Sequence, residues 1–182
     1  MYQIDFNHPA NVYFIGIGGI SMSGFAQLLH DYGFQVHGSD AHESKITDHL
    51  ESLGIHIIYG QSKENITGDI DFVVYTAAIH PDNPEFKAAK ELGLPMMERA
   101  EMVGQVMKNY QNAIAISGTH GKTTTTSMVS HIFLEAQKDP TISVGGILKV
   151  IDGNIRVGHS QDFITEACEY TNSFLKFHPT AG

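Results

Sequence analysis

Short apolar runs alternate with stretches of helical periodicity along the first hundred residues, and glycines punctuate them. This alternation is typical of a parallel sheet whose strands are joined by crossover helices. It predicts an α/β fold, with the strands at residues 12–15, 34–38, 55–59, 71–75 and 94–97. The first predicted helix has its apolar face within residues 22–29. Three further helices are predicted at residues 44–53, 83–93 and 100–108.

The same pattern restarts after residue 112. A buried strand at residues 113–117 leads through a second glycine-rich turn into a helix, followed by strands at residues 141–144, 155–157 and 162–166 and a helix start at Ser173. The predicted apolar face of the long helix comprises Met128, Val129, Ile132, Phe133 and Ala136. We place a domain boundary near residues 105–112. This divides the chain into residues 1–108 and residues 109–182, and the second part is small for an independent α/β domain.

Composition places the chain among globular proteins. Of its 182 residues, 42% are hydrophobic and 17% are charged, and the formal charge of -9 disfavours a nucleic-acid partner. No secretory signal or stretch of 18 apolar residues is present, so we expect no membrane insertion. The single Cys168 excludes an internal disulfide and fits a reducing compartment, which favours the cytoplasm. We expect Cys168 to be a small packing residue rather than a nucleophile.

The first glycine-rich segment lies between a predicted strand and a predicted helix. It contains Gly16, Gly18 and Gly19, and the helix begins near Ile20 and Ser21. Glycines let the backbone approach a diphosphate, whose charge is stabilised by free N–H groups at the helix N-terminus. The strict dinucleotide-binding pattern has glycine where this chain has Ser21.

A second feature of this candidate site lies at the end of the next strand. Asp40 follows the glycines by about twenty residues, the spacing at which an acidic residue commonly meets a ribose hydroxyl. Ser39 precedes it, and we expect His80, just after the fourth strand, to line the mouth of the same site. Taken alone, this pattern also fits a tight turn with an exposed aspartate.

The second glycine-rich segment again joins a strand to a helix. Its residues are Gly118, Thr119, His120, Gly121, Lys122, Thr123 and Thr124. Such a loop holds phosphates with backbone N–H groups, its lysine reaches the β- and γ-phosphates, and the next hydroxyl can hold Mg²⁺. The general P-loop spacing requires glycine at position 116, where this chain has Ile116, so the loop is a shortened variant. We predict an ATP site with Lys122 as a catalytic residue.

Glu166 ends a predicted strand and is the candidate for completing a Mg²⁺ site with Thr123. The metal of a triphosphate needs a carboxylate near the hydroxyl of the loop. A pair of solvated glutamates would be the simpler interpretation if the loop were not present upstream. The eleven histidines show no metal-binding spacing such as H-E-x-x-H. His120 stands apart because it lies inside the phosphate loop, where we expect it to meet phosphate or substrate.

Together these segments resemble the Mur ligases of bacterial cell-wall synthesis. The resemblance is carried by residues 14–24, 82–85, 98–102, 118–125 and 166–174. The first segment is similar to the family's uridine-diphosphate loop, with Ser21 where glycine is usual, and the fourth is similar to its shortened ATP loop. The last is similar to an acidic stretch, and it departs from the commonest form at Cys168, Tyr170, Thr171 and Asn172. The resemblance therefore covers essentially the whole chain.

The resemblance implies a fold of three domains. Residues 1–108 would be the Rossmann-like UDP-sugar domain and residues 109–182 an incomplete P-loop central domain, with the C-terminal domain absent. The chain would then be an N-terminal fragment, and inactive alone. The implied site residues are Gly16, Gly18, Gly19, Ile20, Ser21, Ser39, Asp40, His80 and His120 for the UDP-sugar, residues 118–124 for ATP, Thr123 and Glu166 for Mg²⁺, and Lys122 and Glu166 for catalysis.

The implied reaction is a ligation in peptidoglycan synthesis. ATP phosphorylates the lactyl carboxylate of UDP-N-acetylmuramate to an acyl phosphate, and the amine of L-alanine displaces the phosphate. Two other interpretations stay open, an NAD(P)-dependent oxidoreductase and a non-catalytic UDP-sugar-binding module. A hydride-transfer enzyme has no use for the loop around Lys122, and ATP turnover distinguishes the module from the ligase. The sequence leaves open whether the protein forms oligomers.

Overall fold

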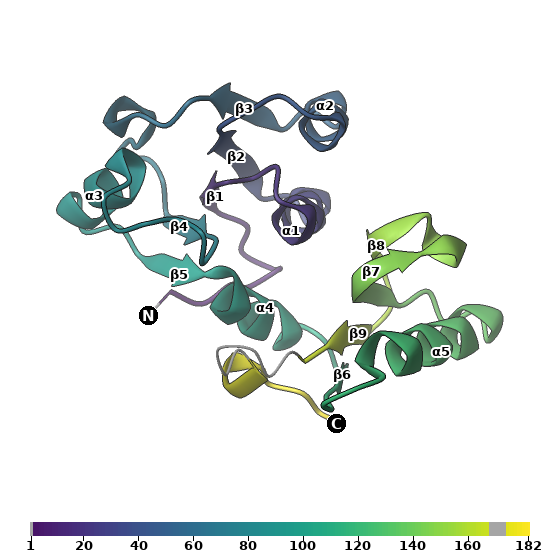
Figure 1. The fold of residues 1–182 in the computed structure, drawn as a ribbon. Helices are drawn as coiled ribbons and strands as arrows, with labels where there is room; N and C mark the ends of the chain where they lie inside the picture. The colour runs from purple at the N-terminus through teal and green to yellow at the C-terminus, as the bar shows by residue number, and fades with distance from the viewer. Residues whose placement is uncertain (1, 168–173) are drawn as a thin grey trace. The chain divides into compact units, whose positions relative to one another are not determined.

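The fold comes from a computed structural model that describes residues 2–167 and 174–182 (Figure 1). Contacts divide it into two compact units, one ending at Met102 and the other beginning at Val103. The division falls within helix α4 (Arg99–Met107), a few residues before the boundary that the sequence suggests. No described helix combines the length and the apolar character that crossing a bilayer requires.

The first unit contains a five-stranded parallel sheet with the order β3-β2-β1-β4-β5. Its strands are β1 (Asn11–Ile15), β2 (Gln35–Asp40), β3 (His56–Tyr59), β4 (Phe72–Tyr75) and β5 (Met96–Glu98). Its other elements are α1 (Ile20–Asp31), α2 (Lys45–Ser52), η1 (Lys63–Asn65) and α3 (Pro84–Glu91). The strand order reverses at β1, and ligands of such sheets bind in the crevice at this reversal. The predicted Rossmann-like sheet is confirmed.

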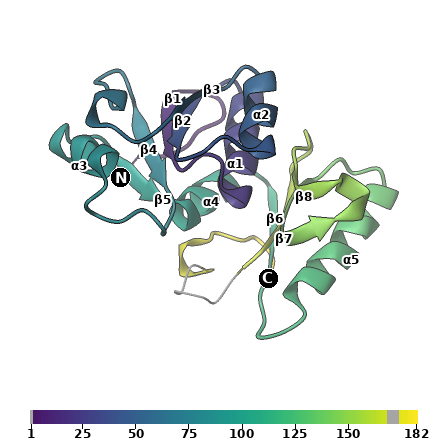
Figure 2. The ribbon, with the colours of Figure 1, turned by 45° about the horizontal axis from the view of Figure 1, so that its top comes forward.

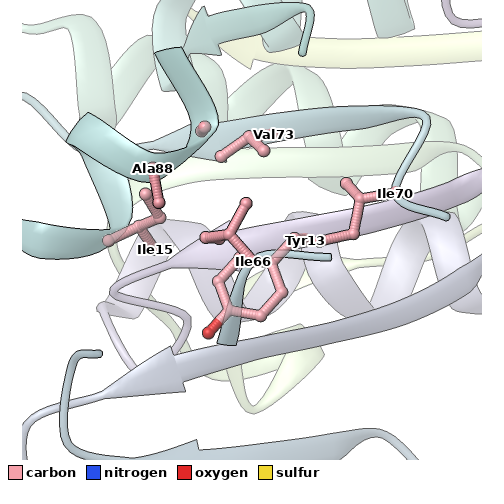
Figure 3. Close-up of a cluster of buried hydrophobic side chains, with 7 residues drawn as sticks. Tyr13, Ile15, Ile66, Ile70, Val73 and Ala88 are labelled. Carbon is pink, nitrogen blue, oxygen red and sulfur yellow. The ribbon is translucent and has the colours of Figure 1, made fainter. Parts of the chain in front are cut away.

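The central strand β1 explains why this unit folds around it. Four of its five residues, from Val12 to Ile15, are fully buried, as expected for a parallel strand covered on both faces. Helices α1 and α2 lie on one side of the sheet and α3 on the other (Figure 1). Figure 3 shows the apolar cluster in which Tyr13 and Ile15 pack with Val73 and Ala88. The carboxyl end of β1 is thereby held firmly, and the first glycine loop starts there.

The second unit contains a four-stranded sheet with the order β6-β9-β7-β8. Its strands are β6 (Asn112–Ile116), β7 (Thr141–Leu148), β8 (Gly153–Arg156) and β9 (Asp162–Glu166). Its helical elements are α5 (Lys122–Glu135) and the short η2 (Lys149–Ile151). β6, β9 and β7 are parallel, whereas β8 forms an antiparallel hairpin with β7. Figure 2 shows α5 running along this sheet, which it contacts through β7 and β9.

Helix α5 departs from its predicted apolar face. Val129 and Phe133 do pack against the cluster formed by β7 and β9. Met128 and Ile132, which we expected on the same face, are instead 56% and 65% exposed. Successive helical positions are about 100° apart, so a stripe that includes both 128–129 and 132–133 is wider than the sheet covers. The predicted helix start at Ser173 and the expected packing role of Cys168 lie outside the described residues.

Candidate functional site

The first glycine loop joins β1 to α1 and is tied to the end of β2 by its backbone. The N–H groups of Gly16 and Ile17 both donate to the carbonyl oxygen of Ser39, at 2.9 and 3.0 Å. The N–H of Gly18 donates to Oδ2 of Asp40 at 2.8 Å. These three bonds fix the loop at the point where the strand order reverses, which is where a ligand of this fold binds.

Gly18 has no room for a side chain. A Cβ at this position would lie 2.8 Å from Oδ2 of Asp40 and 2.9 Å from Cγ2 of Thr47. The other oxygen of Asp40 accepts from the N–H of Ala41 at 2.8 Å. Asp40 therefore holds the glycine loop through Oδ2, while Oδ1 bonds to the backbone that follows β2. The sequence had suggested for Asp40 only a contact with a ribose hydroxyl.

The start of α1 presents favourable electrostatics for an anion. Its N-cap is Gly19, which offers no side chain to cap the helix, and the first turn contains no acidic residue. The positive end of the helix dipole is therefore not offset by a nearby carboxylate within that turn. Nη1 of Arg99 donates to Oγ of Ser21 at 3.3 Å, which brings a guanidinium to the same turn. Arg99 belongs to the segment 98–102 that carries the resemblance, but it was not among the predicted site residues, because it lies 78 positions further along the chain than Ser21.

Three of the predicted UDP-sugar residues have surroundings that the sequence did not suggest. The side chain of Ser39 is fully buried and donates to Oε2 of Glu85 at 2.5 Å, so Ser39 faces the loop only through its backbone. His80 lies in the exposed turn before α3, where its Nδ1 is 3.2 Å from Oδ2 of Asp82. Ile20, at the first position of α1, is 66% exposed.

The second glycine loop joins β6 to α5. Helix α5 begins at Lys122, and its N-cap Gly121 has a φ of 77°, in the left-handed region that favours glycine. Nζ of Lys122 donates to the carbonyl oxygen of Gly118 at 2.6 Å, so the ammonium lies across the loop. As in α1, the first turn of α5 contains no acidic residue. Thr119, His120 and Thr124 are exposed, which leaves this part of the loop open to a ligand.

Three residues from different elements meet beside Lys122. Oγ1 of Thr123 in α5 donates to Oε2 of Glu166 in β9 at 3.1 Å, so the fold brings these two predicted metal ligands together. The N–H of Gly145 in β7 donates to Oε1 of the same carboxylate at 2.9 Å. A Cβ at position 145 would lie 2.7 Å from Oε2, so glycine is needed for this contact. Gly145 carries no motif that would have identified it.

A hydroxyl and a carboxylate oxygen side by side are hard oxygen ligands of the kind that Mg²⁺ prefers. Thr123 and Glu166 therefore fit the metal that the resemblance implies. Among residues 2–167 and 174–182, no three His, Cys, Asp or Glu side chains form a cluster that could hold a metal. Mg²⁺ is usually bound by one or two carboxylates together with substrate phosphates and waters, and Thr123 and Glu166 would supply the protein's ligands in such a site.

Comparison with known proteins decides the family. Residues 11–111 match the family described as "Mur ligase family, catalytic domain". The chain belongs to the Mur ligase family. This Mur ligase chain is 65% identical over 179 residues to UDP-N-acetylmuramate–L-alanine ligase of Agathobacter rectalis, and 67% identical over 180 residues to that of Lachnospira eligens. These matches cover 98% and 99% of the chain but 39% of each relative, so the chain spans about 39% of their length.

Solved structures agree with this family. The crystal structure of UDP-N-acetylmuramate-alanine ligase from Thermotoga maritima superposes with a TM-score of 0.82 at 35% identity, over 93% of this Mur ligase chain and 39% of that protein. A ligase of Neisseria meningitides, named for UDP-N-acetylmuramate:L-alanyl-gamma-D-glutamyl-meso-diaminopimelate, gives a TM-score of 0.84 at 26% identity, over 96% of the chain and 59% of that protein. The fold of both units is therefore found in solved Mur ligases.

Proposed function

We propose that this chain is the part of a UDP-N-acetylmuramate–L-alanine ligase that binds the UDP-sugar and the phosphates of ATP. The carrying observation is its identity of 65% and 67%, over nearly its whole length, with relatives of that name. The geometry of both glycine loops supports the proposal, because each presents the N-terminus of a helix with no acidic residue in its first turn. We propose a cytoplasmic location for the chain, because ATP and UDP-sugars are made inside the cell.

In the first unit, the diphosphate of UDP-N-acetylmuramate would lie at the start of α1. Backbone N–H groups of the loop and the helix dipole would stabilise its charge, and Arg99 would add a guanidinium beside Ser21. Asp40 would keep the loop in place through Gly18 and offer a remaining lone pair to the ribose.

In the second unit, the loop of residues 118–124 would hold the phosphates of ATP. Lys122 would stabilise the charge that develops on the transferring phosphoryl group as the lactyl carboxylate attacks the γ-phosphorus. Thr123 and Glu166 would hold Mg²⁺, which supplies charge neutralisation to the phosphates. ADP leaves as the acyl phosphate forms. The amine of L-alanine then attacks the carbonyl carbon of the acyl phosphate, loses a proton and displaces inorganic phosphate, which gives the amide.

Calorimetry with the 182-residue chain tests the UDP-sugar site. We expect UDP-N-acetylmuramate and UDP to bind, and NAD to bind more weakly or not at all. Tighter binding of NAD would instead support the dinucleotide-dependent oxidoreductase. Absence of UDP binding by a well-folded sample would contradict the assignment of the first loop.

A chimaera tests the ligase itself. The 182 residues would be joined to the remaining, unmatched residues of the Agathobacter rectalis ligase, whose matched part is 65% identical. We expect the chimaera to form the amide of L-alanine with ATP hydrolysis that depends on both substrates. The 182-residue chain alone should bind UDP and ligate nothing, because catalysis needs phosphates enclosed on both sides. Alanine-dependent ATP turnover by that chain would contradict this part of the proposal.

A further inference from the structure

A buried carboxylate connects four elements of the first unit. Glu85, in the first turn of α3, is fully buried. Its Oε1 accepts from the hydroxyl of Tyr13 in β1 at 2.9 Å and from Nδ2 of Asn65 in η1 at 2.6 Å. Its Oε2 accepts from Oγ of Ser39 in β2 at 2.5 Å. Asn83 fixes the start of the helix that carries Glu85, because its Oδ1 accepts from the N–H of Glu85 at 2.9 Å.

Packing alone does not explain a carboxylate at this place. All three side-chain donors of Glu85 are neutral groups, so no cation from them offsets the removal of its charge from water. Desolvating a carboxylate is expensive, and well-packed apolar groups of the same volume often give equal or greater stability. The hydrogen bonds of Glu85 do fix the side-chain positions of Tyr13, Ser39 and Asn65, which apolar packing alone would not fix.

Ser39 links this network to the diphosphate loop. Its side chain donates to Glu85, while its carbonyl oxygen accepts from the N–H groups of Gly16 and Ile17 at 2.9 and 3.0 Å. Glu85 therefore orients Ser39 through its side chain, and the carbonyl group of the same residue accepts the hydrogen bonds of the loop. Asp40, the next residue, accepts from Gly18, so the same stretch of backbone controls three consecutive loop amides.

We propose that Glu85 is a positioning residue for the diphosphate loop, which it holds in its binding conformation through Ser39. Glu85 itself has no contact with the ligand. The inference rests on the proposed function for the identity of the ligand, whereas the link from Glu85 to the loop exists without it.

The test is residue-resolved amide exchange of the ligand-free 182-residue chain with Glu85→Gln. Glutamine keeps the volume and one acceptor oxygen of Glu85. Its NH₂ group replaces the other oxygen, so one of the present donors loses its acceptor. We expect exchange of the Gly16 and Ile17 amides to become about tenfold faster, the change that loss of one hydrogen bond to a charged group produces. UDP binding by the same variant should weaken about fivefold, because part of the binding energy then orders the loop.

Ile70→Val is the matched control. Ile70 lies in the same apolar cluster, but next to the amino end of β4, and its neighbour Asp71 contacts Asn11 at the start of β1 (Figure 3). This substitution lowers overall stability without touching Ser39, so the Gly16 and Ile17 amides and the UDP affinity should keep their wild-type values. Ser39→Ala breaks the same link from the other side, and it decides the question if Glu85→Gln does not fold.

The outcomes separate the two proposals. Faster exchange at Gly16 and Ile17 in Glu85→Gln or Ser39→Ala, and not in Ile70→Val, supports the positioning role. Loop amides that exchange at the rate of the control in both variants overturn it, whatever the change in stability. If the wild-type chain does not bind UDP, the proposed function fails, and the exchange measurement still decides the role of Glu85.

Discussion

The two glycine loops share a local plan of strand, glycine-rich turn and helix, yet the groups behind them differ. The first loop is held from the protein interior, through Ser39 and Asp40 and the buried Glu85 behind them. In the second loop, Lys122 bonds to Gly118 of the same loop. The carboxylate of Glu166 meets Thr123 at the exposed carboxyl end of the sheet.

The helices that follow the two loops also differ in how many of their residues are buried. Helix α1 buries seven residues, among them Phe25 and Leu28, whereas the longer α5 has two buried residues, Thr126 and Ser130. If the first loop presents its amides to a diphosphate, as we propose, it gains from a rigid base, because the ordering is complete before binding. The proposed role of Lys122 in phosphoryl transfer instead requires that its side chain can reach the transferred group. We therefore expect changes at the first loop to alter affinity and stability, and changes at the second to alter rate.

Lys122→Ala should give the largest effect of all. In the chimaera we expect the ligation rate to fall by about a thousandfold or more, since an ammonium lost from a phosphoryl-transfer site removes several kcal/mol from the transition state. UDP affinity should be unchanged, because the diphosphate loop belongs to the other unit. Steady-state kinetics and calorimetry measure the two quantities. Lys149→Ala, at an exposed lysine of the same unit, is the control, and a rate within about tenfold of wild type for Lys122→Ala would contradict its catalytic role.

The next largest effect is on the free energy of unfolding, and it compares the loss of one buried tyrosine hydroxyl in each unit. Tyr13 donates to the carboxylate of Glu85 at 2.9 Å, whereas Tyr110 donates to the neutral hydroxyl of Thr141 at 3.0 Å. Tyr13→Phe should lower the free energy of unfolding by about 2 kcal/mol and Tyr110→Phe by about 1 kcal/mol, because hydrogen bonds to charged groups are the stronger ones. Urea denaturation of the 182-residue chain measures both. Equal losses would show that the hydrogen bond to the buried carboxylate of Glu85 contributes no more stability than the bond between two neutral hydroxyls.

Arg99→Ala should weaken UDP binding about tenfold, or about 1.4 kcal/mol, by removing the guanidinium beside Ser21. Arg99→Lys should recover part of this loss, because it restores the charge without the planar fork. Calorimetry with UDP measures the change. Arg156→Ala is the matched control, since that arginine lies in the second unit and pairs with Asp139 at 2.5 Å. An equal loss of UDP affinity in both variants would remove Arg99 from the site.

The smallest effect is a dependence of stability on alkaline pH. Burial raises the pKa of Tyr13 well above its usual value of 10.0, and the nearby carboxylate of Glu85 adds to the increase. Below about pH 10 this tyrosine is protonated in both the folded and the unfolded chain. Above it, the unfolded chain releases the proton while the folded chain retains it, so the free energy of unfolding falls by up to about 1.4 kcal/mol per pH unit.

Tyr13→Phe should remove this contribution to the slope. The pKa values of Tyr2 and Tyr59 are also raised, that of Tyr2 by burial and that of Tyr59 by desolvation and then by Glu51, so part of the slope should persist. Urea midpoints between pH 9 and pH 11 measure the difference. Identical slopes in the wild-type chain and in Tyr13→Phe would contradict the assignment to Tyr13.

Much of the local plan could be predicted from the residues alone. The apolar run before each glycine segment marks a strand, and the loop chemistry identifies Gly18 and Lys122 without any knowledge of distant neighbours. Asn83 and Pro84 were expected to start a helix, and α3 begins there. These features depend on interactions within a few positions of the chain, which is why a pattern in the sequence suffices.

What the sequence by itself determined is the α/β class and the two glycine-rich segments between a strand and a helix, for which phosphate binding stays a prediction. Only the tertiary structure decided that Arg99 meets Ser21, that Gly145 orients Glu166, and that Glu85 lies behind the first loop. Each of these contacts joins residues far apart in the chain. They exist because the strand order β3-β2-β1-β4-β5 and the order β6-β9-β7-β8 bring particular strand ends together. Strand order depends on how helices and strands bury their apolar faces against one another, and no local pattern contains that information.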